Sequence, residues 1–381
     1  MQNTISGYKS VLVSDGIRSS ALATPEKTAL AESERVLSYK ELVWRINRVA
    51  DGLHSKMAMQ KHDHIALMSP NCLEFIEIVC GAADAGLATA MINPRLTAHE
   101  AAYICNDSKA KILFVHHSLR ELMATVKLES VATIIVIGDG YEEWLLENKQ
   151  EQPDIQIEET DIFAIPYTAG TTGQPKGVLL PHRSRVLTFF AMAVEYGCYS
   201  SEDRSLAIAP LFHGAGFAFA LAPVFFGGFC EILPKFDPEQ VLKKLSENKI
   251  TNTFMVPTHF NAIFALPEET RSSHQFPEFH TLISNAAPLP QKTKERIVEY
   301  FGEGKLNECY GSTEGGIVCN LKPPDQLRKL KCVGKAFPCT GLKLLIKWEK
   351  PLKKTKSANC IAVHLFYSAV IGECLRKPTH H

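Results

Sequence analysis

Short apolar runs recur along the chain and are separated by polar or amphipathic stretches. They contain five to eight residues and are rich in β-branched side chains, a pattern typical of buried strands. The predicted strands are HIALM (64–68), ILFVHH (112–117), TIIVIG (133–138), DIFAIPYT (161–168), SLAIAP (205–210), CEILP (230–234), TFMVP (253–257) and TLISN (281–285).

Amphipathic segments lie between several of these runs. In YKELVWRINRVADGL (39–53), Leu42, Ile46, Val49 and Leu53 recur at helical spacing. The alternation of strands with helices predicts an α/β protein with largely parallel sheets. Ligands of such sheets usually bind at the carboxyl ends of the strands, so segments that follow a strand are candidate sites.

The character of the chain changes after residue 342. KWEKPLKKTK (347–356) is basic, and IAVHLFYSAVI (361–371) is apolar without a clear period. Residues 343–381 contain eight Lys and Arg against two acidic residues, which gives this tail a charge near +6. The apolar run is shorter than the roughly 18 residues that span a bilayer. It is open to three interpretations: a strand, a buried helix, or a segment that packs against nothing.

Composition narrows the class of protein. The 381 residues are 45% hydrophobic and 22% charged, as in ordinary globular proteins, and Lys and Arg balance Asp and Glu at 41 each. No global charge therefore indicates a nucleic-acid partner or an anionic membrane. The eleven cysteines form no CxxC pairs, and the N-terminus does not resemble a signal peptide. We expect free thiols, no transmembrane segment and a cytoplasmic location.

The segment TAGTTGQPKG (168–177) follows an apolar run and is rich in glycine and threonine. It does not match a Walker A loop, because Pro175 occupies the position of the second glycine and Gly177 that of the Ser or Thr. Phosphate would be held here by close backbone approach, by threonine hydroxyls and by the charge of Lys176. An ordinary flexible turn is the alternative that composition leaves open.

Three further motifs make a resemblance specific. In order along the chain, YTAGTTGQPKGVLLPH (167–182), PLFHGAG (210–216), SNAAPLP (284–290) and YGSTE (310–314) resemble motifs of the adenylate-forming, AMP-binding superfamily. The likeness is to its acyl- and aryl-CoA synthetases, of the fatty-acid or 4-coumarate–CoA ligase type. It implies two mostly parallel-sheet subdomains in an αβαβα arrangement, over residues 1–185 and 186–342.

The resemblance also implies an activity and its reactants. Members activate a small carboxylic acid with ATP and Mg²⁺, form an acyl-adenylate, and transfer the acyl group to coenzyme A. Fatty and aryl acids both remain open as substrates, and no oligomeric state is predicted. No nucleic-acid partner is expected.

Site residues follow from the same motifs. The resemblance places Lys176, His213 and Glu314 in catalytic roles, and Thr168 with Glu314 at the magnesium ion. His213 would orient the acid substrate, although a lone histidine on an apolar segment is more often a core residue. The nucleotide would contact Thr168, Gly170, Thr171, Thr172, Gly173, Lys176, Asn285, Ala286, Ala287, Tyr310, Gly311 and Thr313.

The likeness ends soon after VGKAFPCTGLKLL (333–345). Family members continue through a barrel-like segment to a TGD motif and a small mobile domain, and no TGD motif occurs after residue 342. We interpret the chain as C-terminally truncated, with residues 343–381 as a divergent tail, and expect impaired adenylation. Two alternatives stay open: a non-catalytic nucleotide- or acyl-binding remnant, and an interaction protein that uses the tail to contact a membrane or partner.

Overall fold

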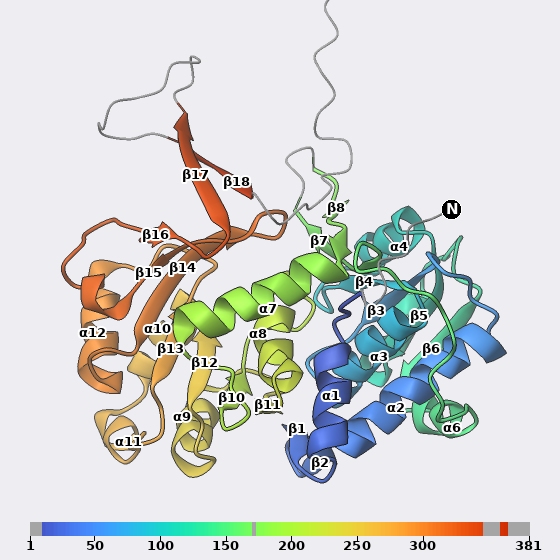
Figure 1. The fold of residues 1–381 in the computed structure, drawn as a ribbon, viewed down its shortest axis with the longest axis horizontal. Helices are drawn as coiled ribbons and strands as arrows, with labels where there is room; N and C mark the ends of the chain where they lie inside the picture. Colours follow the sequence, from blue (N-terminus) through green and yellow to red (C-terminus); the bar gives the residue numbers. More distant parts are fainter. Residues whose placement is uncertain (1–9, 170–172, 346–358, 365–381) are drawn as a thin grey trace, which may run out of the picture. The chain divides into compact units, whose positions relative to one another are not determined.

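A computed structural model describes residues 10–169, 173–345 and 359–364 (Figure 1). The chain divides into two compact units. The first unit comprises Met1–Lys27, Leu37–Ser69 and Glu74–Val186, and the second comprises Thr28–Val36, Pro70–Leu73 and Leu187–His381. Each unit is built around its own sheet.

The first unit contains a seven-stranded sheet in the order β6-β5-β3-β4-β7-β8, with β9 also paired to β7. Its strands from β6 to β7 are parallel, and β8 and β9 pair antiparallel with β7. The strands are β3 (His64–Met68), β4 (Ala88–Ile92), β5 (Ala110–His116), β6 (Thr133–Ile137), β7 (Ile162–Thr168), β8 (Lys176–Gly177) and β9 (Leu180–Pro181).

Local sequence signals explain the helices of this unit. Ser38 with Glu41, and Thr97 with Glu100, form capping boxes that satisfy backbone donors at the starts of α2 and α4. The predicted apolar stripe of α2 is buried, as is Leu53 just beyond it. The helices are α1 (Asp15–Ala23), α2 (Tyr39–Asp51), α3 (Leu73–Asp84), α4 (Ala98–Asp107), α5 (Arg120–Ala124) and α6 (Tyr141–Leu146), with a π-helix at Gly52–Lys56 and a 3₁₀ turn at His117–Leu119.

The second unit contains a nine-stranded sheet in the order β16-β15-β14-β13-β12-β10-β11-β1-β2. The strands from β14 to β1 are parallel, and β15 and β16 add antiparallel at one edge. The strands are β1 (Thr28–Glu32), β2 (Arg35–Ser38), β10 (Arg204–Ala207), β11 (Phe229–Ile232), β12 (Asn252–Met255), β13 (Thr281–Ser284), β14 (Leu306–Ser312), β15 (Gly316–Leu321) and β16 (Lys335–Ala336).

Helices cover both faces of this second sheet. Met255 packs in a core cluster with side chains of α9, α10 and α12, whereas the neighbouring Phe254 stacks on Phe219 of α8. Successive strand residues point to opposite faces, so α8 covers the face opposite to α9, α10 and α12. The helices are α7 (His182–Tyr196, shared with the first unit), α8 (Gly214–Phe225), α9 (Pro238–Glu247), α10 (Pro257–Ala265), α11 (Glu268–Ser272) and α12 (Gln291–Phe301), with a 3₁₀ turn at Pro323–Asp325.

A separate two-stranded antiparallel sheet joins β17 (Thr340–Leu345) to β18 (Asn359–His364). Of the apolar run 361–371, residues 361–364 therefore form part of a strand, and the rest lies outside the described residues.

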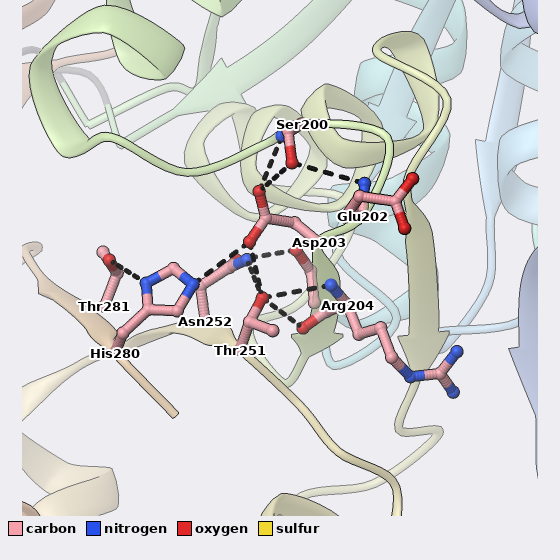
Figure 2. A network of polar contacts seen from close by, with 9 residues as sticks. Ser200, Glu202, Asp203, Arg204, Thr251, Asn252, His280 and Thr281 are labelled. Atoms are coloured by element: carbon pink, nitrogen blue, oxygen red, sulfur yellow. Dashed lines mark hydrogen bonds and ion pairs between the residues drawn. The ribbon is translucent and has the colours of Figure 1, made fainter. Parts of the chain in front are cut away.

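The amino edge of the second sheet carries a polar network (Figure 2). The Asp203 carboxylate accepts hydrogen bonds from the Ser200 N–H (2.7 Å) and hydroxyl (2.7 Å) and from the Thr251 hydroxyl (2.8 Å), and His280 Nε2 lies 3.2 Å from it. Burial alone would raise the pKa of Asp203, but the bonds from His280, Ser200 and Thr251 hold it well below its ordinary value. The network ties together the starts of β10, β12 and β13.

The prediction of an α/β protein with two largely parallel sheets is confirmed. In the part of the chain that the structure describes, no helix is both long enough and apolar enough to cross a bilayer.

Candidate active site

The glycine- and threonine-rich segment begins at the carboxyl end of β7, as the position of the apolar run predicts. The chain returns antiparallel as β8, and Thr168 lies directly opposite Lys176 in the ladder. Directly opposite residues of antiparallel strands project to the same face, so the Thr168 hydroxyl and the Lys176 ammonium share one side of the hairpin. The Thr168 hydroxyl also lies 3.5 Å from the Lys176 carbonyl oxygen.

The chemistry of this hairpin suits an anion. Lys176 is exposed, and its ammonium forms no ion pair with any other described residue. Gly173 has φ +90°, the left-handed region that favours glycine, and nothing lies within 4 Å of where its Cβ would be. Of the predicted phosphate ligands, Gly170, Thr171 and Thr172 lie outside the described residues.

The second group of predicted residues follows neighbouring strands of the second unit. Strands β10, β12, β13 and β14 are parallel and adjacent, so their carboxyl ends meet at one edge of the sheet. His213 follows β10, Asn285 directly follows β13, and Tyr310 lies near the end of β14. The structure therefore assembles three separate sequence motifs at the edge where α/β proteins bind ligands.

His213 stands immediately before α8, where it is the N-cap residue. Its ring lies against the Phe212 ring, with centroids 4.3 Å apart, while the side chain keeps an exposed surface. Partial burial lowers the pKa of His213 below its ordinary value, which favours the neutral form of the ring. A neutral imidazole offers one donor and one acceptor to a ligand.

The segment that carries His213 is held by close packing. A Cβ on Gly216 would lie 2.1 Å from the Pro210 carbonyl oxygen, so only glycine lets the start of α8 approach the preceding turn. Every α8 residue except Ala215 is buried. The small residues after His213 thus serve packing first, and their expected role in an acyl pocket stays a prediction.

Asn71 is a residue whose role the sequence did not reveal. Its buried amide accepts from the Leu211 N–H (2.8 Å) and donates to the carbonyls of Ala209 (3.2 Å) and Leu233 (3.2 Å). These bonds fix the backbone between β10 and His213. The partners are backbone groups 138 to 162 residues away in the sequence, so no side-chain pattern could have indicated them.

The segment that follows β13 has a backbone conformation that leaves its alanines exposed to solvent. The Asn285 side chain accepts a hydrogen bond from the Ala286 N–H at 2.5 Å, and Ala286 adopts φ +75°. Burial raises the pKa of the Cys309 thiol, which directly precedes Tyr310, to about 12. Ala286 and Ala287 are both exposed, as a flat wall for a ligand would require.

The remaining predicted residues occupy the β14–β15 hairpin. Tyr310 is a large aromatic side chain that stays 45% exposed. At the next residue the strand register shifts, and a Cβ on Gly311 would lie 2.1 Å from the Gly316 carbonyl oxygen. Thr313 and Glu314 follow in the tight turn, with Glu314 exposed. Within the described part of the chain, the Glu314 carboxylate forms no ion pair.

A buried ion pair between α12 and β14 stabilises this edge of the sheet. Lys294 of α12 and Glu308 of β14 pair at 3% and 6% residue exposure, and Glu308 also accepts from the Leu289 N–H at 3.1 Å. The pair connects α12, the segment after β13, and β14. Charges this deep are costly unless paired, so the arrangement constrains the backbone around Asn285 and Tyr310.

The donor set fits a magnesium ion held mainly by nucleotide oxygens. The described residues contain no group of three or more His, Cys, Asp or Glu side chains able to hold a metal. Mg²⁺ commonly binds through one or two protein oxygens together with substrate phosphates. The exposed Glu314 carboxylate of the second unit is a ligand of that kind.

Comparisons with known proteins agree with these motifs. A family profile described as "AMP-binding enzyme" matches residues 17–357. The chain is 30% identical over 297 residues to 4-coumarate–CoA ligase 2 of Solanum tuberosum, covering 75% of this chain and 54% of that protein. It is 30% identical to a feruloyl-CoA synthase of an Amycolatopsis species over 77% of this chain and 58% of that protein. The chain thus spans about half the length of the curated relatives it matches.

Solved structures show the same fold. The inhibitor-bound N-terminal domain of FACL13 from Mycobacterium tuberculosis matches with a TM-score of 0.83 and 26% identity, over 88% of this chain and 85% of that one. The anthranilate CoA ligase AuaEII, in complex with anthranoyl-AMP, matches with a TM-score of 0.87 over 94% of this chain and 69% of that one, and at 24% identity it supports the fold alone. With a family profile over most of its length and the motifs in place, this chain belongs to the AMP-binding enzyme family of adenylate-forming proteins.

Proposed function

We propose that this chain carries the nucleotide- and acid-binding part of an ATP-dependent acyl- or aryl-CoA ligase. The observation that carries the proposal is the carboxyl edge of the second sheet, where His213 follows β10, Asn285 follows β13 and Tyr310 lies near the end of β14, each with exposed surface. Family membership adds the reaction class. The names of the curated relatives add aromatic acids of the coumarate type as a substrate class, and a similar solved structure, the fatty acyl CoA synthetase of Mycobacterium tuberculosis, adds fatty acids.

The reaction has two steps. A carboxylate oxygen of the substrate attacks the α-phosphorus of ATP, and the bond to the β-phosphate oxygen breaks, which releases pyrophosphate and leaves an acyl-adenylate. The sulfur of coenzyme A then attacks the acyl carbon, its thiol proton is lost, and AMP leaves. Catalysis of this kind depends mainly on positioning and charge stabilisation.

The residues divide these tasks by their chemistry. Lys176 supplies a positive charge for the β- and γ-phosphates, and the Thr168 hydroxyl and Glu314 carboxylate would hold Mg²⁺. When bound, that ion neutralises phosphate charge. Tyr310 offers its exposed ring to adenine, with Asn285 through Ala287 as the facing wall, and Thr313 donates to the α-phosphate. Neutral His213 donates a hydrogen bond that orients the attacking carboxylate.

A second candidate function is binding without turnover. Residues 343–381 contain no TGD motif, whose aspartate the family resemblance assigns to the ribose hydroxyls, and their lysines lie in no motif of the family's small domain. Losing one transition-state donor commonly costs about 10²–10³ in rate. We therefore expect the 381 residues by themselves to adenylate weakly or not at all while still binding nucleotide.

ATP–pyrophosphate exchange separates the two functions. Purified protein is assayed with a panel of hydroxycinnamic and fatty acids, beside Lys176→Ala and the exposed control Lys292→Ala. Acid-dependent exchange that Lys176→Ala abolishes and Lys292→Ala preserves supports a ligase. Nucleotide binding without exchange, whichever acid is added, supports the binding function. If the folded chain shows neither exchange nor nucleotide binding, the proposal is contradicted.

A further inference from the structure

The segment 327–333 presents apolar side chains to solvent. Leu327 is 45% exposed, Leu330 68% and Val333 46%. Single exposed hydrophobic residues are common on protein surfaces. Among the described residues eleven large hydrophobic side chains are exposed, and three of these fall within the seven positions 327–333. We call residues 327–333 the leucine loop.

The leucine loop is held in place at both ends, so its apolar side chains are exposed in a defined backbone conformation. On one side Gln326 is fully buried and donates to the Leu321 carbonyl at 2.6 Å. On the other side a Cβ on Gly334 would lie 1.9 Å from the Asn320 carbonyl oxygen, which permits only glycine there. Between these anchors the Lys329 N–H donates to the Asp325 carbonyl at 2.9 Å.

Basic side chains surround the exposed leucines. Residues 326–336 contain Arg328, Lys329, Lys331 and Lys335 and no acidic residue. Arg328 and Lys329 both pair with the single carboxylate of Asp325, which leaves an excess of positive charge. Lys331 and Lys335 are exposed and form no ion pair with any described residue.

We infer that the leucine loop docks the protein onto an anionic phospholipid surface. Exposed leucine and valine can enter the headgroup region, while lysine and arginine keep their charges at the phosphates. The composition favours lipid over protein, because protein interfaces are rich in aromatic residues and poor in lysine at their centres. The loop contains no aromatic residue. This inference does not depend on the proposed ligase activity.

The test is vesicle sedimentation with the full chain. Vesicles of phosphatidylcholine with phosphatidylserine are compared with pure phosphatidylcholine, at low and high salt. The inference predicts binding to the anionic vesicles that weakens with salt, because exposed charges are screened. Two double variants test the loop and the basic residues around it: Leu327→Ser with Leu330→Ser, and Lys331→Glu with Lys335→Glu. Each should weaken binding by roughly tenfold or more, since each residue removed contributes several-fold.

Matched controls carry the same chemical changes elsewhere. Leu22→Ser changes an 88% exposed leucine of α1, and Lys292→Glu reverses an exposed charge on α12. Both should bind like the unmodified chain, and thermal unfolding should be unchanged in all variants because the altered side chains are exposed. Absence of binding to anionic vesicles would overturn the inference. So would binding that the loop variants leave intact, since the contact would then lie elsewhere in the chain, and so would retention on an immobilised acidic peptide but not on vesicles.

Discussion

The two edges of the second sheet use similar polar residues in opposite ways. At the amino edge, Thr251 and His280 both bond to the Asp203 carboxylate, so the hydrogen-bonding capacity of these groups is largely consumed within the protein (Figure 2). At the carboxyl edge, Tyr310 and Glu314 are exposed. A polar group already bonded contributes to stability, whereas an uncommitted one is available to a ligand. The amino edge therefore holds the strands together, and the carboxyl edge is the side we assign to binding.

The buried ion pair of Lys294 and Glu308 connects α12 to β14, and breaking it should cause the largest loss of stability. Lys294→Met would leave the Glu308 carboxylate buried without its partner, and we expect unfolding free energy to fall by about 3–5 kcal/mol. Chemical denaturation measures this. Combining Lys294→Met with Glu308→Leu should recover much of the loss. The exposed neighbour Lys292→Met serves as control, and an equal loss there would show that the pair has no special role.

Asp203→Ala should have the next largest effect, because several donors at the amino edge would lose a charged acceptor. We expect a loss of about 2–4 kcal/mol in unfolding free energy with unchanged nucleotide binding. Asp139→Ala, which removes a 62% exposed carboxylate with a surface ion pair to Arg120, should cost well under 1 kcal/mol. A drop in nucleotide binding by Asp203→Ala at full folding would contradict the division between the edges.

The pH dependence of stability provides a subtler test at the same residue. The folded pKa of Asp203 is lowered, so its stabilisation is complete above the unfolded pKa of about 3.9 and is lost as pH falls toward the folded value. Asp203→Asn should therefore be less stable than the unmodified chain near pH 7, and the gap should narrow below about pH 4. Denaturation curves across this range measure the gap, and a constant difference would argue against the charged network.

The two histidines give the smallest stability effects and the cleanest contrast. His280 is about half exposed, so His280→Ala should cost at most about 1 kcal/mol and leave the site intact. His213→Ala should leave stability nearly unchanged but weaken capture of the acid substrate. Differential scanning fluorimetry measures the stability of each variant, and calorimetric titration with the carboxylic acid in the presence of Mg·ATP measures capture of the substrate. If His280→Ala weakened capture of the acid and His213→Ala did not, the binding site would lie at the amino edge, and our assignment of the carboxyl edge would be wrong.

Periodicity and motifs predicted much of this arrangement. Apolar runs such as 64–68 became buried parallel strands, because burial on both faces of a sheet requires a continuous hydrophobic run. The motif residues His213, Asn285 and Tyr310 lie at one edge of the second sheet, because β10, β13 and β14 are parallel and their carboxyl ends meet there. Their individual roles remain predictions.

Contacts between residues far apart in the sequence were not predicted. Asn71 bonds to backbone groups, Lys294 pairs with Glu308 across the fold, and β1, near the N-terminus, pairs with β11 in the second sheet. In the sequence these residues are ordinary polar or weakly alternating positions. Their function depends on which partners the topology brings close, and no local pattern records that information.

The most direct test of the account is calorimetric titration of the full chain with Mg·ATP, comparing Tyr310→Ala and Glu314→Ala with His280→Ala. Exposed side chains make these substitutions mild for folding, so binding is the informative quantity. The account predicts that each carboxyl-edge substitution weakens binding by roughly tenfold, about 1.4 kcal/mol, and that His280→Ala leaves it unchanged. Equal binding by all four proteins, or a loss confined to His280→Ala, would contradict the assignment of the carboxyl edge as the nucleotide site.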